Sequence, residues 1–346
     1  MATFDEVQKI MAEQFKEIFK AHKEPPDKSA DKKLIINAAV SGGVLSRYHN
    51  PNLPVTTEEV TREVRSAYNA GAAIWHIHPR DPDTGVLAMG DKRTQIHKEW
   101  CDSVFQVAPD IITNAGALYG PPTKLIEGTN LVDEECLRAE NRLASVVEPI
   151  IQASPKKNNR YMEMAIPLVR SFALGGSLIL SFNPRVGVQY DVEYFESKGI
   201  KPELSPFSYP DVQDAKAWVV DTGLAKPPVL FDTLIGVHNA PNPKPCMEAI
   251  QYLFTFVRAL PEGVLWQALV GGRYWLPLAA VAIMLGADSV RVGLEDSTYM
   301  YPHSTELLKE NGSIVEAVAG IARYLGREVA SPSEAREILH IPQLSE

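Results

Sequence analysis

Short apolar runs alternate with helical patterns along most of the chain, from Leu34 onward. Each run is followed by a polar or glycine-containing loop, and then by a segment in which apolar residues recur every three or four positions. The runs are typical of buried parallel strands, and the periodic segments are typical of amphipathic helices. Eight such units without long hairpins predict an α/β fold, a (β/α)8 TIM barrel, rather than an open doubly wound sheet.

The expected elements follow one another in chain order. Expected strands cover residues 34–40, 74–78, 110–114, 169–174, 201–205, 228–234, 265–270 and 289–292. Expected helices cover residues 57–71, 94–107, 133–153, 191–199, 215–224, 247–260, 275–285 and 313–325. The first helix is expected to begin at Thr57, although the residue three positions on, Val60, is not the acidic residue of a capping box. Residues 118–168 are too many for one loop and one helix, which predicts an insertion.

The first 33 residues stand apart from this pattern. Apolar residues recur at helical spacing over residues 4–19: Phe4, Val7, Met11, Phe15, Ile18 and Phe19. Residues 21–33 are charged, contain two prolines and lack periodicity, which is typical of a linker. We expect an N-terminal helix and linker over residues 1–33, with the helix packed on the domain or on a neighbouring subunit. The barrel domain is expected over residues 34–346.

Composition narrows the classes of function. The 346 residues are 45% hydrophobic and 22% charged, as in a soluble globular protein. A formal net charge of −9 argues against nucleic acid or an anionic membrane surface as the main partner. Cys101, Cys136 and Cys246 lie far apart in the sequence. The N-terminus has acidic residues from Asp5 onward and no apolar core, so we expect no secretory signal there, and no run of about 18 apolar residues follows that could span a membrane. We expect a reduced, cytoplasmic protein.

His76 and His78 lie at the end of the expected second strand. Alternate side chains of a strand share a face, so both imidazoles point the same way, while Trp75 and Ile77 point the other way. Pro79 then ends the strand, which puts the pair at the rim of the sheet. Such a pair provides half of a metal site, although an isolated His-x-His is roughly as often a hydrogen-bonded core pair.

The expected eighth strand carries Arg291 and leads into Glu295 and Asp296. In a barrel, strands two and eight both neighbour strand one, so Glu295 can approach the histidines across roughly 9–10 Å between backbones. Two imidazoles and a carboxylate leave coordination positions open, which suits a catalytic metal, with zinc first and iron, manganese or nickel as alternatives. The arginine beside two carboxylates could also be a salt-bridged strand end, but together with the histidines it favours a metal site.

Gly271, Gly272 and Arg273 follow the expected seventh strand and are candidates for substrate binding. Their backbone N–H groups and the guanidinium could bind an anion, or the two glycines could form only a tight turn. The sequence has no Gly-x-Gly-x-x-Gly at a strand–helix junction and no Walker loop, which argues against a dinucleotide or nucleotide site.

Several stretches resemble the β-keto acid cleavage enzyme family, and in particular its 3-keto-5-aminohexanoate cleavage enzymes. These stretches are residues 35–43, 50–56, 76–78, 236–237, 271–273, 290–296 and 335–339. Residues 1–33 and 118–168 fall outside the resemblance. It implies a zinc-bearing (β/α)8 barrel, usually a homotetramer, that reacts a β-keto acid with acetyl-CoA to give acetoacetate and a new acyl-CoA.

The resemblance also implies roles for individual residues. By position, His76, His78 and Glu295 correspond to the zinc ligands of the family. Asp296 corresponds to its catalytic acid/base, and Arg291 to the arginine that assists the coenzyme A step. Such a reaction is chemically consistent, since a metal-bound ketone acidifies the neighbouring CH₂ group and a carboxylate can then remove its proton.

The substrate contacts implied by the resemblance depart from the family pattern. Asn114 and Ser177 fall near the family's substrate-binding serine and threonine, and both remain polar. Val44 stands where the aminohexanoate enzyme has a glutamate that pairs with an ammonium group, so we expect a different β-keto acid. Ser205 replaces a second carboxylate after strand five, so either Glu203 takes over its supporting role or that support is lost.

Two other functions stay open from the sequence. A metal-dependent hydrolase or aldolase could use the same barrel without coenzyme A. A catalytically silent barrel could bind metal or acyl-CoA for regulation, although simple metal binding would need neither Arg291 nor Asp296. No Gly-x-Ser-x-Gly element is present, which fits a reaction without a covalent serine nucleophile.

Overall fold

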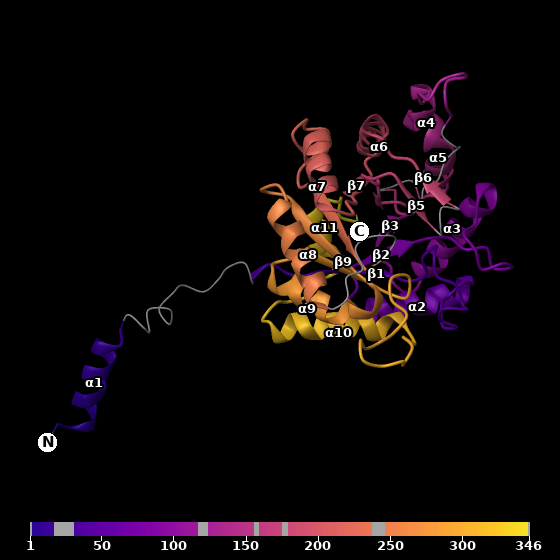
Figure 1. Cartoon of the computed structure of the whole chain (residues 1–346). Coiled ribbons are helices and arrows are strands. Elements are labelled where there is room, and N and C mark those ends of the chain that lie inside the picture. Colours follow the sequence, from indigo (N-terminus) through magenta and orange to yellow (C-terminus); the bar gives the residue numbers. More distant parts are fainter. Residues whose placement is uncertain are drawn as a thin grey trace.

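Eight parallel strands close into a barrel in the computed structural model of the chain (Figure 1). The structure describes residues 2–16, 31–116, 124–155, 159–174, 179–236 and 246–344. The barrel strands are β1 (Ile35–Ala39), β2 (Ile74–Ile77), β3 (Ile112–Ala115), β4 (Met164–Ala165), β7 (Lys201–Leu204), β8 (Leu230–Ile235), β9 (Leu265–Val270) and β10 (Ser289–Val292). Their order around the barrel is β1-β10-β9-β8-β7-β4-β3-β2. The predicted (β/α)8 barrel is confirmed.

Helices surround the barrel and bury their apolar faces against it (Figure 1). They are α2 (Thr57–Ala70), α3 (Gly90–Val104), α5 (Ala144–Ala153), α6 (Arg185–Ser197), α7 (Tyr209–Ala215), α8 (Cys246–Ala259), α9 (Trp275–Met284), α10 (Asn311–Tyr324) and α11 (Pro332–Leu339). In α2, for example, Val60, Val64 and Ala67 are buried on one face. Within the described ranges, each helix is too short or too polar to reach across a lipid bilayer.

The start of α2 differs by one residue from the expected cap. Thr56, and not Thr57, is the N-cap, and its hydroxyl accepts a hydrogen bond from the Glu59 N–H. The Glu59 carboxylate accepts in return from the Thr56 N–H at 3.0 Å. Counted from Thr56, the third residue is therefore acidic, and the helix has a complete capping box.

The fourth barrel strand is β4, and the prediction of a barrel strand over residues 169–174 is wrong. β4 pairs with β3 on one side and with β7 on the other. Phe172–Leu174 instead forms β5, which pairs antiparallel with β6 (Ile179–Ser181) in a separate two-stranded sheet. A strand of two residues is too short to show an apolar pattern, whereas the run in the hairpin is long enough to imitate one. The region expected to be an insertion thus contains a barrel strand.

The helix expected over residues 133–153 is divided into shorter pieces. A 3₁₀-helix (Glu134–Leu137) is followed by α4 (Ala139–Arg142) and α5. Arg138, between the first two, is extended with a ψ of 139°. The Asn141 side chain donates to the Glu135 carbonyl at 2.8 Å. Such side-chain bonds to the backbone compete with continuous helix, and apolar spacing alone does not detect them.

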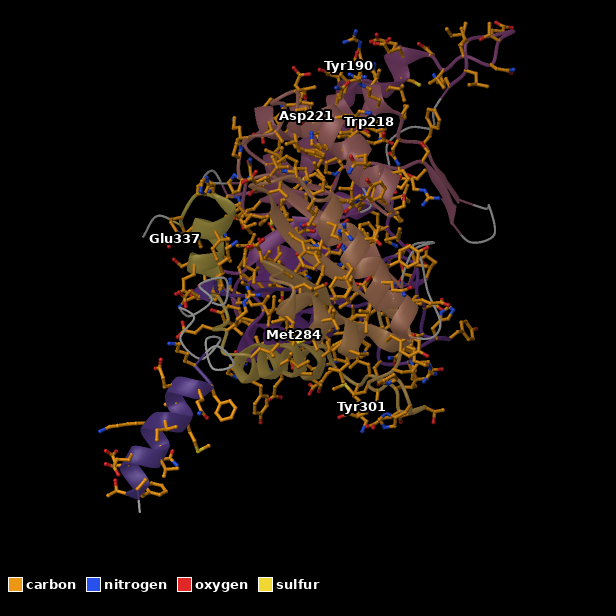
Figure 2. The ribbon with its side chains drawn as sticks, turned by 60° about the vertical axis from the view of Figure 1, so that its left-hand side comes forward. Tyr190, Trp218, Asp221, Met284, Tyr301 and Glu337 are labelled. Carbon is orange, nitrogen blue, oxygen red and sulfur yellow. The ribbon has the colours of Figure 1, made fainter. Side chains whose placement is uncertain are left out.

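The N-terminal helix α1 (Phe4–Gln14) projects away from the barrel (Figures 1 and 2). It begins with a capping box between Thr3 and Glu6 and has no buried residue, and Phe4 is 82% exposed. The predicted helix is confirmed over this range, but its predicted packing on the barrel is not found among the described residues. Residues 17–30, which include most of the expected linker, lie outside the described residues.

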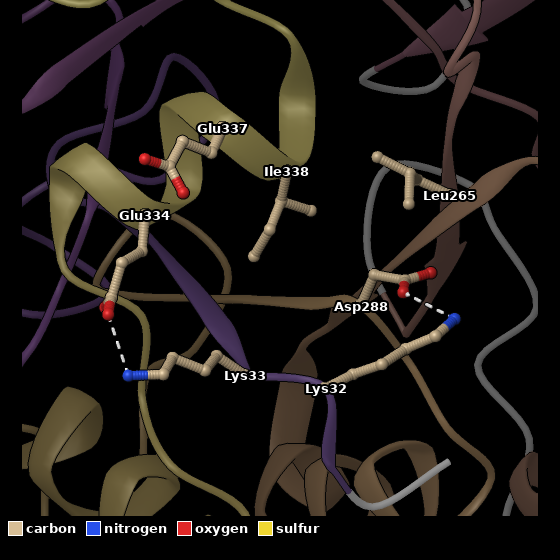
Figure 3. A pocket seen from close by; sticks show the side chains of 7 residues that line it. All are labelled: Lys32, Lys33, Leu265, Asp288, Glu334, Glu337 and Ile338. Atoms are coloured by element: carbon tan, nitrogen blue, oxygen red, sulfur yellow. Dashed lines mark hydrogen bonds and ion pairs between the residues drawn. The ribbon is translucent and has the colours of Figure 1, made fainter. Parts of the chain in front are cut away.

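Lys32 and Lys33 lead into β1 beside a pocket at the amino ends of the strands (Figure 3). Lys32 pairs with Asp288 at 3.4 Å between Nζ and Oδ1, and Lys33 pairs with Glu334 of α11 at 2.7 Å between Nζ and Oε1. Barrel enzymes place their reactive groups at the other end, where the strands have their carboxyl ends. We therefore interpret this pocket as part of the closure of the barrel.

A buried ion-pair cluster fastens α11 beneath the barrel. The Arg336 guanidinium binds both carboxylate oxygens of Glu163, just before β4, at 2.7 and 3.1 Å. Arg160 donates to the same carboxylate at 3.1 Å. The side chains of Arg336 and Glu163 are each only 1% exposed. Removing one partner would therefore leave a charge buried with fewer compensating contacts.

We expect Arg336→Met to lower the free energy of unfolding by about 3 kcal/mol, as measured by urea denaturation. The matched control is Lys33→Met, which breaks exposed ion pairs on the same side of the molecule. Such pairs contribute little to stability, so the control should unfold near the wild-type midpoint. Equal midpoints for both variants would show that the buried cluster does not stabilise the fold.

Candidate active site

His76, His78 and Glu295 meet at the mouth of the barrel. His76 lies on β2, His78 follows its last residue, and Glu295 follows β10. The two Nε2 atoms are 2.8 Å apart, and His78 Nε2 is 3.2 Å from Glu295 Oε1. His76 Nε2 is 3.7 Å from Glu295 Oε2. The shared orientation of the histidines, predicted from strand parity, and the approach of the carboxylate across β1, predicted from the closure of the barrel, are found in the structure.

The electrostatic environment favours the metal-binding forms of His76 and Glu295. Burial, followed by the Arg291 charge, places the pKa of His76 well below its usual value, which keeps the imidazole neutral. Burial alone would raise the pKa of Glu295, but Arg291 and the two histidines lower it well below its usual range. Neutral imidazole and carboxylate are the ligand forms of zinc and similar ions. One ligand atom from each residue lies within 4.8 Å of the others, close enough to share an ion.

Two glycines allow backbone to pass next to the three ligands. A Cβ on Gly116, after β3, would lie 2.6 Å from ring atoms of both His76 and His78. A Cβ on Gly42 would lie 2.2 Å from Glu295 Cγ, and Gly42 also has a positive φ of 66°. A side chain at either position would displace a ligand, so the site depends on glycine there.

Arg291 joins the ligand Glu295 to Asp296. Its Nε and Nη2 atoms lie 3.0 and 3.2 Å from the two carboxylate oxygens of Asp296, and Nη2 lies 2.8 Å from Glu295 Oε1. All three residues are 3% exposed. The salt-bridged strand end considered from the sequence is therefore present, and it lies against the candidate metal ligands rather than in place of them.

The residues that follow β9 adjoin Asp296. The Gly272 N–H donates to the Asp296 carbonyl at 2.8 Å, and Gly271 N donates to the carbonyl of Ile235 at the end of β8. Residues Gly272–Tyr274 form a 3₁₀ turn. Arg273 donates to the Ser304 carbonyl at 2.6 Å, and its guanidinium lies 3.9 Å from the centre of the Tyr299 ring. Arg273 thus holds the loop between β10 and α10, part of which is at the surface near Tyr301 in Figure 2.

The other predicted substrate contacts differ in their surroundings. Asn114 on β3 contacts His76, with 2.5 Å between Asn114 Oδ1 and His76 Nδ1, and it donates from Nδ2 to Glu203 at 2.7 Å. Val44, in the loop after β1, is 51% exposed. Ser177 lies outside the described residues.

Two polar residues inside the barrel were not predicted. Gln267 on β9 donates to Glu203 at 3.1 Å and to Asp232 on β8 at 3.0 Å. Ser205 contacts the other oxygen of Asp232 at 3.4 Å. Burial raises the pKa of Asp232 to about 6, and burial and the charge of Asp232 raise the pKa of Glu203 well above its usual value. Gln267 and Asp232 could have been found from the sequence, because each is a polar residue in the middle of an otherwise apolar strand.

Comparison with known proteins agrees with the geometry. A family model described as beta-keto acid cleavage enzyme matches residues 33–341. The chain is 32% identical over 309 residues to a 3-keto-5-aminohexanoate cleavage enzyme of Acetoanaerobium sticklandii, covering 89% of this chain and 98% of the relative. It is 25% identical over 318 residues to a 3,5-dioxohexanoate:acetyl-CoA acetone transferase of Paraburkholderia graminis, covering 90% and 96% respectively.

A solved structure shares the fold. The binary complex of ObcA with oxaloacetate matches 84% of this chain and 68% of that chain, with a TM-score of 0.61 and 19% sequence identity. At this identity the match supports the barrel and says nothing about the reaction.

Proposed function

The chain belongs to the β-keto acid cleavage enzyme family, and on this premise we propose that it reacts a β-keto acid with acetyl-CoA at a zinc ion held by His76, His78 and Glu295. The acetyl group becomes joined to the CH₂–COO⁻ part of the keto acid, which gives acetoacetate. The remaining acyl group of the keto acid leaves on coenzyme A. The observation that carries the proposal is the contact of Arg291 with both Glu295 and Asp296, which brings a base beside the metal ligands.

The donor set fits zinc with room for a substrate. Three protein ligands are the usual number at a catalytic zinc site, where a further position is left for water or substrate. When bound, zinc supplies a Lewis acid that makes the CH₂ group next to a coordinated ketone more acidic. The three protein ligands are nearly inaccessible to solvent, and a dry site strengthens such electrostatic effects.

Asp296 is the residue to which we assign removal of the CH₂ proton. Arg291 fixes its carboxylate through two N–H groups, and the Gly272 N–H holds its backbone. Burial lowers the pKa of Arg291, but the charges of Asp296 and Glu295 outweigh it and raise that pKa, so the guanidinium stays a cation. It can therefore stabilise the negative charge that develops on oxygen during acyl transfer.

Because Val44 lies in the loop after β1, we propose that the substrate is a β-keto acid that carries no ammonium group near this loop. A half-exposed valine cannot pair with a cation, so a charged amine would lose its water there without gaining a partner. We expect Val44→Glu to raise kcat/KM for 3-keto-5-aminohexanoate by about fivefold, equivalent to an exposed ion pair of roughly 1 kcal/mol. The kcat/KM for an uncharged keto acid of the same length is the control, and it should not rise.

A panel of β-keto acids with different terminal charges, assayed with and without acetyl-CoA, tests the proposed function. We expect acetoacetate only when acetyl-CoA is present, with loss of turnover after zinc is removed by a chelator and recovery after zinc is restored. Turnover that does not depend on acetyl-CoA would support the metal-dependent hydrolase or aldolase instead.

We further propose that the enzyme is a cytoplasmic homotetramer. The tetramer follows from the family resemblance, and the location is supported by the free thiols of Cys101 and Cys136. Light scattering of the purified protein measures its oligomeric state directly.

A further inference from the structure

Asn114 lies between a candidate zinc ligand and the polar interior of the barrel. We propose that Asn114 is a positioning residue, which acts through His76 by fixing the tautomer that presents Nε2 to the metal, rather than through direct contact with substrate. The inference rests on the proposed zinc site and adds a role for a residue that the sequence assigned to substrate binding.

The placement of Asn114 follows from strand register. His76 on β2 and Asn114 on β3 are register partners, so their side chains lie side by side on the same face of the sheet. Asn114 Oδ1 is 2.5 Å from His76 Nδ1, and Asn114 Nδ2 is 2.7 Å from Glu203 Oε2. Both Asn114 and Glu203 are fully buried. The two ends of the amide are therefore each committed to a protein partner.

The contact with Glu203 determines which way the side-chain amide of Asn114 points. A proton on Glu203 is shared with Asp232, whose side chain is hydrogen-bonded to Glu203, so the Glu203 oxygen beside Asn114 accepts; the amide NH₂ of Asn114 therefore faces Glu203, and its carbonyl faces His76. A flipped amide would put two acceptors together at Glu203. A carbonyl oxygen can only accept, and so the proton of neutral His76 has to be on Nδ1.

Gln267 holds Glu203 in turn. The side-chain carbonyl of Gln267 accepts from Asn37 at 3.2 Å and from Ser289 at 2.8 Å, which leaves its NH₂ group to donate to Glu203 Oε1 at 3.1 Å. The NH₂ group of Gln267 faces Glu203 Oε1 at 3.1 Å and Asp232 Oδ1 at 3.0 Å, so a reversed amide would place its oxygen against both carboxyl groups. A continuous chain of hydrogen bonds thus connects Gln267, Glu203, Asn114 and His76: Gln267 and Asn114 both donate to Glu203, and His76 donates from Nδ1 to Asn114.

The consequence lies at Nε2. With the proton on Nδ1, the Nε2 lone pair points toward the space shared with His78 and Glu295. The opposite tautomer would place an N–H there, and binding an ion would then first require loss of that proton. Partners of this kind, behind metal-ligating histidines, typically change metal affinity by about 10- to 100-fold.

The test compares Asn114→Leu and Asn114→Asp in the full-length protein. Leucine has a similar size but no acceptor, and we expect it to weaken Zn²⁺ affinity by about 10- to 100-fold in competition with a chromogenic chelator. Aspartate keeps an oxygen for the Nδ1 proton, and burial raises the pKa of Glu203 so that a proton can lie between the two carboxyl groups; we expect this variant to bind Zn²⁺ within a few-fold of wild type. Nitrogen-15 NMR of histidine-labelled, zinc-free protein should show the Nδ1–H tautomer for His76 in the wild type and the aspartate variant, and its loss in the leucine variant.

Thr113→Val is the matched control. Thr113 neighbours Asn114 on β3 but points to the other face, where its hydroxyl donates to the Arg160 carbonyl at 2.9 Å. The control should lose stability but keep wild-type Zn²⁺ affinity. If Asn114→Leu fails to fold, Glu203→Gln serves instead. The NH₂ group of the introduced glutamine must face the NH₂ group of either Asn114 or Gln267, which interrupts the chain of hydrogen bonds. We therefore expect weaker Zn²⁺ binding from this variant as well.

Two results would overturn the inference. One is wild-type Zn²⁺ affinity and an unchanged His76 tautomer in a folded Asn114→Leu protein or, where that protein does not fold, in Glu203→Gln. The other is an equal loss of affinity in Asn114→Asp and Asn114→Leu, because an acceptor for Nδ1–H would then not be what matters. Failure of the proposed function is distinguishable from both, since the wild-type protein would then bind no Zn²⁺ or catalyse no reaction dependent on acetyl-CoA.

Discussion

Asp296→Asn is expected to lower kcat for acetoacetate formation by about 10²- to 10⁴-fold while leaving the zinc content unchanged. Asparagine has the size of aspartate, and its carbonyl can still accept from Arg291, so the ligands nearby should stay in place. It cannot take up a proton from carbon. The measurements are steady-state kcat with a β-keto acid and acetyl-CoA, and metal content by mass spectrometry of the same sample.

Asp191→Asn provides the matched control for this prediction. Asp191 on α6 is also buried beside an arginine, at 2.9 Å from Arg142 Nη2, but it lies on an outer helix. The control should keep full activity if it folds. Wild-type turnover in Asp296→Asn would remove Asp296 as the base and leave the proton transfer without an assigned residue.

His76→Ala is expected to reduce zinc affinity by on the order of 10²-fold or more, because loss of a residue that binds the ion should matter more than loss of a residue that only contacts such a ligand. Activity dependent on acetyl-CoA should fall with it. The loss should also appear without any substrate, as a smaller thermal stabilisation on adding Zn²⁺, since an ion that binds only the folded state raises its stability.

The comparison for His76→Ala is a second buried histidine. His97 on α3 makes a hydrogen bond of 2.7 Å with the Tyr161 carbonyl, and burial lowers its pKa to about 4. His97→Ala should therefore lose stability but keep its response to Zn²⁺. Full zinc occupancy in His76→Ala would show that the ligand assignment is wrong.

Most of the fold could be predicted because strand and helix periods differ clearly in this chain. The run at β10 was predicted with the bounds that the structure gives it, since polar loops flank it on both sides. β4 was missed for the opposite reason, because its contacts with β3 and β7 come from tertiary pairing and not from a pattern of its own. Hydrogen bonds from side chains to nearby backbone, such as that of Asn141, likewise interrupt a helix, and apolar spacing in the sequence does not reveal them.

The candidate metal ligands could be predicted because they follow from strand parity and from the closure of the barrel. Because they are two residues apart at the end of β2, the histidines had to share a side, and β10 had to return beside β1. The orientation of Asn114 could not be predicted, because it depends on Glu203 and Gln267, whose strands are remote in sequence. The contact of Arg273 with Ser304 could not be predicted either, because it depends on how the loop between β10 and α10 returns to the end of β9.

The ion pair between Glu163 and Arg336 also means that the fold cannot be completed until late in synthesis on the ribosome. These two side chains are 173 positions apart, and β1 must wait for β10 before the ring of strands is complete. At a synthesis rate of about 5–20 residues per second, the first half of the chain spends many seconds with unpaired strand edges. Nascent chains arrested before Arg336 should therefore be held by chaperones far more strongly than chains released after it.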